Sequence, residues 1–307
     1  MIRFVAIRLL RAVLTVLAVA LFAAIAMRVS GDPAVIALGP TAPAEAIAAY
    51  RVQHGLDQPL VVQIFVQFTA LLSGDFGISP LNGRSALQVV SQRVPLTLLL
   101  AIPALLIKVL VGIPAGTIAA IRQNSLLDRL VMSASVIGIA IPNFVIGLGL
   151  VLIFAINLGV LPSSGQPNLP GMIMPVLTLA LAGIGTLARF TRSSVLGVIN
   201  QPHVRTAYAK GLTERQVIRR HILPNATAAM FPVLGLMLGS VLAGTVVVET
   251  LFSWPGIGSL LVTAVANRDI YVVPCILVLS SVVMTLTNVG VDVLQALRDP
   301  RILQRGR

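Results

Sequence analysis

The chain has few of the residues on which catalytic and metal sites depend. Only one of its 307 residues is a cysteine, Cys275, which excludes an intramolecular disulfide and a cysteine metal cluster. Its three histidines, His54, His203 and His221, show neither H-E-x-x-H spacing nor pairing with cysteines, so a zinc site is not expected. No G-x-S-x-G elbow is present to position a serine nucleophile. We therefore expect no catalytic residue and no bound metal in this chain.

Lysine is also scarce, and its placement excludes a nucleotide-binding loop. A Walker A loop needs a lysine between a glycine and a serine or threonine, because the amine must reach the phosphates from a backbone cradle. Here Lys108 is followed by Val109, and Lys210 is followed by Gly211. The chain therefore cannot hydrolyse ATP by that route.

Charged residues make up only 10% of the chain, whereas hydrophobic residues make up 57%. The mean hydropathy of +0.97 is typical of a polytopic membrane protein, and we expect an all-α one. A formal net charge of +12 would point to nucleic acid in a soluble protein. In a membrane protein, the charges must first be placed relative to the bilayer.

Residues 1–30 are predicted to form the first transmembrane helix. Arg3, Arg8 and Arg11 precede an apolar run that could be either a signal peptide or a spanning helix. The triplet at 24–26 resembles a cleavage site, but the run is long enough to span with modest tilt. We favour an uncleaved helix that enters from the cytoplasm.

Residues 31–94 contain several prolines and scattered charges, and we expect an extracytoplasmic helical region there. The apolar stretch from Leu60 to Leu72 is too short to span, and Gln63 and Gln67 share one of its faces. It is better interpreted as an interfacial or packed helix.

Residues 95–294 are predicted to be a core of five further spans, and residues 295–307 a basic cytoplasmic tail. The five spans lie at about 95–121, 132–158, 172–190, 226–249 and 274–294. Small residues four apart, as in Gly112/Gly116 and Gly235/Gly239, would let helix backbones approach closely within the bilayer. The fold class is thus an all-α protein with six transmembrane helices.

Positive charges are distributed unevenly over this topology. With a cytoplasmic N-terminus, the inside segments hold Arg3, Arg8, Arg11, Arg122, Arg129, Arg189, Arg192, Arg205, Lys210, Arg215, Arg219, Arg220, Arg298, Arg301, Arg305 and Arg307. The outside segments hold only Arg28, Arg51, Arg84, Arg93 and Arg268. This asymmetry fits the positive-inside rule and places both termini in the cytoplasm. It also explains the net charge without nucleic acid as a partner.

A polar segment at 203–225, which we call the basic segment, separates two of the predicted spans. It is expected to form two short helices joined at Gly211, because Thr213 and Gln216 have capping-box spacing. Pro224 would limit the second helix or kink its connection to the next span. A loop that only orients the protein is the alternative, but the order of turn, cap and apolar positions favours a docking surface.

The basic segment resembles the EAA loop of ABC-importer permeases, whose pattern is roughly E-A-A-x3-G-x9-I-x-L-P. The matching positions here are Arg205, Thr206, Ala207, Gly211, His221, Leu223 and Pro224. Arg205 replaces the usual Glu, and His221 replaces the usual Ile. The R-T-A-x-A-K-G form resembles the peptide and nickel branch of that family.

Other blocks resemble the same branch, in the same order along the chain. They are GDP at 31–33, HGLDQPL at 54–60, GDFG at 74–77, ARFTRSS at 188–194, VVETLFSWPGIG at 247–258 and DVLQALRDPRI at 292–302. The chain is thus similar to the first permease subunit of a dipeptide, oligopeptide, glutathione or nickel importer. Peptide is the substrate we favour, because the spans lack a rich set of histidines and methionines; nickel or a metal chelate is the alternative.

The resemblance implies a type I ABC importer (MetI-like) permease fold in a bacterial inner membrane. It also implies a homologous second permease, two ATPase subunits that bind ATP and Mg, and an extracytoplasmic solute-binding protein. No cofactor is expected in this chain itself, which would be a non-catalytic subunit in the lipid bilayer.

The ATPase-coupling residues implied by the resemblance are Arg205, Thr206, Ala207, Lys210, Gly211, Glu214, Arg215 and His221. The helix that ends near Gly211 would sit in a groove on an ATPase subunit, where small Ala207 and Gly211 allow close approach. Lys210 and Arg215 could pair with acids of the partner, whereas Glu214 would serve the local helix start. Displacement of this segment would tilt the span that begins near Pro224.

Two ionisable residues within predicted spans, Lys108 and Glu249, are candidates for the translocation path. An ionisable group at that depth usually faces an interior or a wet cavity, although Lys108 could instead pair structurally with a carbonyl or with Glu249. Glu249 precedes a turn at 252–258, where Trp254 is expected to be an interface anchor. The resemblance suggests an outer gate or a docking edge for the binding protein there.

Two other classes of membrane protein are alternatives to the importer. A secondary transporter would need no ATPase, but it would show paired internal repeats and intramembrane acids near the midplane, and neither stands out. An intramembrane hydrolase is disfavoured by the absent nucleophile and metal motifs.

Overall fold

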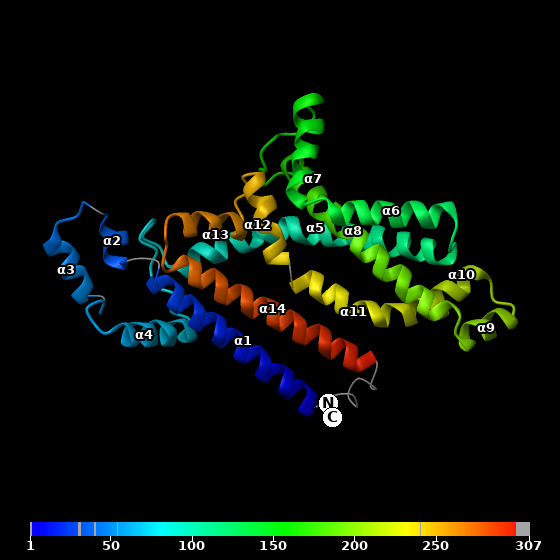
Figure 1. Ribbon diagram of the computed structural model, residues 1–307, viewed down its shortest axis with the longest axis horizontal. Helices are drawn as coiled ribbons and strands as arrows, with labels where there is room; N and C mark the ends of the chain where they lie inside the picture. The colour runs from blue at the N-terminus through cyan, green and yellow to red at the C-terminus, as the bar shows by residue number, and fades with distance from the viewer. Residues whose placement is uncertain (1, 30–31, 40, 54, 240, 299–307) are drawn as a thin grey trace. The chain divides into compact units, whose positions relative to one another are not determined.

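A computed structural model describes residues 2–29, 32–39, 41–53, 55–239 and 241–298 of the protein, and most of these residues lie in helices (Figure 1). In these ranges the sole β-pairing is an isolated bridge between Ile78 and Ser85. The predicted all-α class is therefore confirmed.

The helices before residue 160 are α1 (Ile2–Val29), α2 (Pro33–Leu38), α3 (Ala44–Gln53), α4 (Leu60–Ser73), α5 (Ala86–Ile121), α6 (Leu126–Ala140), α7 (Asn143–Leu150) and the π-helical η1 (Val151–Asn157). Those after it are α8 (Leu169–Ile199), α9 (Pro202–Ala209), α10 (Glu214–Val217), the π-helical η2 (Ile218–Ile222), α11 (Leu223–Gly239), α12 (Val241–Leu251), α13 (Ile257–Ala266) and α14 (Val272–Arg298).

The chain divides into two compact units. The first is formed chiefly by Leu98–Trp254, and the second by Val5–Thr97 together with Pro255–Leu286. Both candidate functional sites lie in the first unit.

Four helices are long and apolar enough to cross a membrane, and a bent pair brings the number to five among the described residues. The four are Val5–Ala26, Ala86–Ile121, Leu169–Ile199 and Val272–Ala296. The pair consists of α6 and α7 with η1, which meet at 99°. Figure 1 shows α7 turning sharply away from α6. The span predicted at about 132–158 is therefore interrupted, because Pro142 disfavours a helical conformation at Ile141, which is extended. Whether the bent pair crosses the membrane as one span stays a prediction.

The fifth predicted span, 226–249, is divided between α11 and α12. Neither helix has the length of a span by itself, and residue 240 between them lies outside the described residues. The count of six spans consequently stays a prediction. Helix boundaries also differ from those expected, since α5 begins at Ala86 and residues 191–199 continue α8.

In the first unit, α8 packs against α6, α7, α11 and α12. Glycines allow α8 to approach α5 and α6 closely, as the sequence predicted for Gly112 and Gly116 of α5. A Cβ added at Gly116 would lie 2.3 Å from the Ala188 carbonyl oxygen, and one at Gly185 would lie 2.6 Å from that of Ser135. The backbones of α5 and α6 therefore each approach that of α8 closely, as expected for helices that associate in lipid.

The second unit contains the short apolar helix expected at Leu60–Leu72, which is α4 with 14 residues. Its Gln63 is buried and donates hydrogen bonds to the carbonyls of Leu56 (2.9 Å) and Gln58 (2.7 Å). The preceding turn is therefore fixed to the helix start. In the same unit, buried Asp269 accepts a hydrogen bond from Ser79 and caps α14 through the Val272 N–H at 3.0 Å.

Trp254 is fully buried, so the expectation that it is an interface anchor is wrong. A Cβ on Gly165 would lie 3.0 Å from its ring, and the Gly165 N–H donates to the Phe252 carbonyl at 2.5 Å. Ser253, with a φ of 53°, makes the turn that brings Trp254 inward.

Candidate functional site

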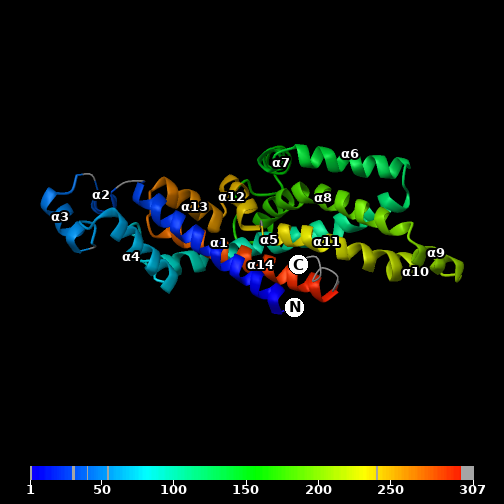
Figure 2. The same cartoon turned by 60° about the horizontal axis from the view of Figure 1, so that its bottom comes forward.

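The basic segment forms two short helices, α9 and α10, on either side of Gly211, as predicted. Gly211 has a φ of 79°, the left-handed conformation that glycine adopts without a Cβ clash. The Thr213 N–H donates to the Gln216 side chain at 2.9 Å, which is one arm of the predicted capping box. Figures 1 and 2 both show α9 and α10 together at the end of α8.

Pro224 neither ends nor breaks the second helix. The chain passes from α10 through η2 into α11 without an interruption. Proline has no N–H to bond to the carbonyl four residues earlier, and the π-helical turn before it accommodates that loss. The Asn225 side chain donates to the His221 carbonyl at 2.6 Å. The basic segment is therefore joined directly to α11.

A small apolar core fixes the basic segment to the rest of the first unit. Its fully or almost fully buried members are Ala120, Val195, Val204, Ala207, Val217, Ile222 and Ala226. They come from α5, α8, α9, α10, η2 and α11. A force applied to α9 would consequently reach α8 and α11 through packed side chains.

The eight predicted coupling residues fall into two groups. Those exposed are Arg205, Thr206, Lys210, Gly211, Glu214 and Arg215. His221 is half-buried, and Ala207 is 2% exposed within the apolar core. The small size of Ala207 therefore serves packing within this chain, because its side chain is not available to a partner.

Tyr208 was not singled out from the sequence, although its side chain is 46% exposed on α9. Its spacing of four residues from buried Val204 would have placed it on the inner face of a regular helix. Sequence spacing therefore gave no signal for its exposure. Exposed tyrosines are among the residues that contribute most to protein interfaces.

Arg192 and Asp128 form a bidentate ion pair between α8 and α6. The Arg192 Nε and Nη2 atoms donate to the two Asp128 carboxylate oxygens at 2.6 and 2.7 Å. Asp128 also accepts from the Asn124 N–H at 3.0 Å, and its side chain is 5% exposed. The pair fixes the start of α6 to α8, close in sequence to the basic segment.

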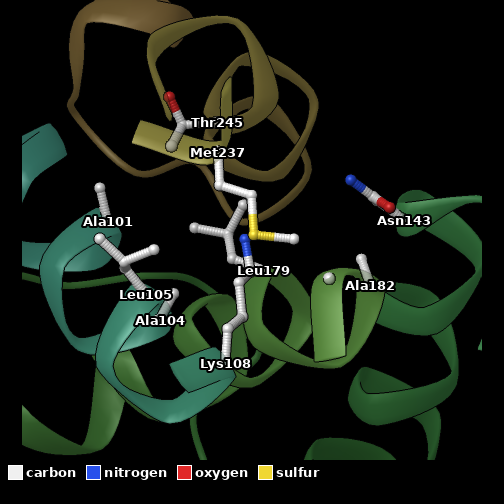
Figure 3. Close-up of a pocket in the computed structure, with 10 residues that line it drawn as sticks. Ala101, Ala104, Leu105, Lys108, Asn143, Leu179, Ala182, Met237 and Thr245 are labelled. Carbon is white, nitrogen blue, oxygen red and sulfur yellow. The ribbon is translucent and has the colours of Figure 1, made fainter. Parts of the chain in front are cut away.

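A pocket of about 230 Å³ lies within the first unit, and Lys108 is the only ionisable residue among the described residues that line it. The lining residues are Ala101, Ala104, Leu105, Lys108, Asn143, Leu179, Ala182, Gly183, Met237 and Thr245. Figure 3 shows the Lys108 amine pointing toward Met237 in the middle of this group. Within the described part of the chain, no hydrogen bond or ion pair engages this amine.

Glu249 is fully buried on α12 and does not line this pocket. The two candidates for the translocation path are therefore not brought together around one cavity. The structural pairing of Lys108 with Glu249 that the sequence allowed is absent among the described contacts.

The sequence of this helical core matches that of transport permeases. Residues 112–304 match the family "Binding-protein-dependent transport system inner membrane component", and residues 1–101 match the N-terminal domain of the same systems. The chain belongs to this family and is the permease component of an ABC importer.

Two relatives align with most of the chain. The glutathione transport system permease protein GsiC of Salmonella typhimurium (strain LT2) is 41% identical over 303 residues, which are 98% of this chain and 99% of the relative. GsiC of Escherichia coli (strain K12) is 40% identical over 272 residues, 89% of each chain.

Solved structures show the same fold. The inward-facing MetNI methionine ABC transporter aligns with a TM-score of 0.58 at 18% identity, covering 68% of this chain and 96% of that one. An amino acid ABC transporter crystallised with histidines aligns with a TM-score of 0.51 at 20% identity, covering 70% and 94%. The predicted permease fold is therefore confirmed.

Proposed function

We propose that this chain is the permease subunit of an importer for glutathione or a similar short peptide. The observation that carries this proposal is 41% identity over nearly the full length to a glutathione permease. The chain would form the translocation path with a homologous second permease and perform no chemistry on the solute. Two ATPase subunits would bind ATP and Mg, and an extracytoplasmic binding protein would deliver the solute.

The basic segment is proposed to receive the mechanical input. Exposed Arg205, Tyr208 and Lys210 on and after α9 would contact an ATPase subunit, with Arg205 and Lys210 pairing with acids there. The packed core beneath α9, and its uninterrupted connection to α11, would carry the displacement into the membrane. Thr206, Gly211, Glu214, Arg215 and His221 complete the proposed coupling residues.

The solute would pass through the first unit near Lys108, which we place on the translocation path; buried Glu249 remains a candidate for that path. The chain would lie in a bacterial inner membrane with both termini in the cytoplasm, as the distribution of basic residues favours.

A nickel or metal-chelate solute is the second candidate. A chelated metal needs no protein ligands, and the described residues hold no group of three metal-binding side chains.

Co-purification and uptake test this function together. An affinity-tagged chain, expressed with its cognate permease and ATPase subunits, should retain both in detergent. Proteoliposomes of this complex, supplied with the binding protein, should take up labelled glutathione only with ATP inside. Uptake by the lone chain driven by an ion gradient would show a secondary transporter instead, and uptake of nickel without glutathione would support the second candidate.

A further inference from the structure

The Lys108 pocket has the composition of a site for one negative charge. Its walls are mostly aliphatic or small, and its other polar side chains, Asn143 and Thr245, carry no charge. An amine in such surroundings attracts an anion more strongly than it would in water, because the local dielectric constant is low. No acid of the described residues lines the pocket to neutralise the amine.

Gly183 on α8 makes room for the Lys108 side chain. A Cβ at this position would lie 2.6 Å from Lys108 Cε, 2.8 Å from Cδ and 3.1 Å from Nζ. Any larger residue would therefore displace the stem of the lysine. The lysine and the glycine come from different helices, α5 and α8, so the position of the amine is built by tertiary packing.

The break between α6 and α7 adds to the positive potential of the pocket. Asn143, the first residue of α7, is one of its lining residues. The N-terminus of a helix carries a partial positive charge and, in broken membrane helices, commonly points at anionic groups. Lys108 and the start of α7 thus favour an anion in the same small volume.

We propose that Lys108 binds the C-terminal carboxylate of the peptide solute during its passage, with Gly183 as the residue that positions the amine. The volume of about 230 Å³ is below the roughly 300–1,000 Å³ of whole-ligand pockets, so it accepts one end of a peptide. A carboxylate is the anionic group that every unmodified peptide carries. This inference rests on the proposed peptide import.

The test compares a solute that has its glycine carboxylate with one in which that group is masked. Uptake of glutathione and of its glycine monoethyl ester is measured in proteoliposomes of the whole transporter with its binding protein. For each solute the wild-type rate is divided by the rate of the Lys108→Met variant, which cancels any preference of the unchanged binding protein. We expect this ratio to be about tenfold larger for glutathione than for the ester, in the range of a lost charge-assisted hydrogen bond.

Two further variants separate charge from folding. Lys108→Arg keeps the positive charge and should recover most of the glutathione uptake. Gly183→Ala should raise the KM for glutathione more than it lowers kcat, whereas Gly149→Ala, at a helical glycine with no atom within 4 Å of an added Cβ, should change neither. ATPase stimulation by the loaded binding protein should persist in Lys108→Met, which shows that the complex is assembled.

The outcomes distinguish this inference from the proposed function. Equal ratios for both solutes, or loss of ATPase stimulation together with uptake, would overturn the carboxylate site alone. Mass analysis of the solute outside and inside the vesicles shows whether the ester crossed the membrane intact, so that its hydrolysis before uptake is not mistaken for equal ratios. Wild-type proteoliposomes that import neither solute would overturn peptide import and, with it, the inference.

Discussion

Gly211 is the residue in the basic segment whose conformation is most constrained. Its φ of 79° is unfavourable for most residues, whereas no atom lies within 4 Å of an added Cβ. The backbone conformation within this chain therefore explains why position 211 is a glycine. Close approach by a partner would add a second constraint, and the two can be separated by substitution.

Gly211→Ala should destabilise the turn by about 1–2 kcal/mol, because alanine disfavours the left-handed region. Gly211→Asn should cost less, since asparagine enters that region more readily despite its larger side chain. We expect uptake to fall in the order wild type, Asn, Ala, Val if conformation decides. Rates that follow side-chain size, with Asn below Ala, would show that an ATPase subunit packs directly on this position.

At the scale of the helix, α9 presents one alanine inward and one outward. Ala207 is buried in the apolar core, and Ala209 is exposed two residues later. Ala207→Leu should overpack that core and destabilise the folded chain by about 1–3 kcal/mol. Ala209→Leu is the matched control and should leave thermal unfolding of the detergent-solubilised chain unchanged.

A lower unfolding temperature for Ala207→Leu alone would confirm that α9 is packed onto its own chain. If Ala209→Leu instead lost ATPase binding without loss of stability, the outward face of α9 would be identified as the contact surface. Equal stability of both variants would contradict the packed core.

The ion pair between Arg192 and Asp128 allows a similar comparison on α8. Arg192→Met leaves the almost buried Asp128 carboxylate without its bidentate partner, and we expect a loss of about 2 kcal/mol, because Arg192 itself is partly exposed. Arg189→Met removes an exposed arginine one turn earlier and should change stability little. Thermal unfolding measures both variants, and equal shifts would show that the pair does not stabilise the contact of α6 with α8.

Local signals in the sequence predicted much of the basic segment. The turn at Gly211 and the capping box from Thr213 to Gln216 each depend on residues close together in the sequence. For this reason the sequence predicts α9, the turn and α10. Three other features depend on neighbours from other helices. They are the burial of Ala207, the pairing of Arg192 with Asp128, and the space that Gly183 leaves for the Lys108 side chain. No local pattern encodes such contacts, and for this reason the sequence could name Lys108 but not its surroundings.

Hydropathy predicted the apolar spans but not their shape. The prediction of one span at about 132–158 did not show its break at Pro142, because averaging over a window of that length hides a single helix-breaking residue. The same averaging joined α11 and α12 into one span. Whether these two helices cross the membrane together is a property of the whole molecule, since it decides on which side each terminus lies.

Labelling of the termini therefore tests the span count. An even number of crossings puts both ends on one side of the membrane, and an odd number puts them on opposite sides. Cys275 is the only native cysteine and is buried, so a Cys275→Ala background allows single cysteines to be introduced at Arg3, Arg84, Arg205 and Gln304. A membrane-impermeant maleimide should label the cysteine at 84 in intact spheroplasts, and those at 3, 205 and 304 only after permeabilisation.

A different labelling result at each introduced cysteine would contradict a different part of the predicted topology. Labelling at 304 but not at 3 in intact spheroplasts would show an odd number of crossings, with α11 and α12 returning to the side from which they enter. Labelling at 205 but not at 84 would reverse the orientation that the basic residues predict. With 3, 205 and 304 protected, the long helices and the bent pair account for five crossings, so α11 and α12 must together supply the sixth.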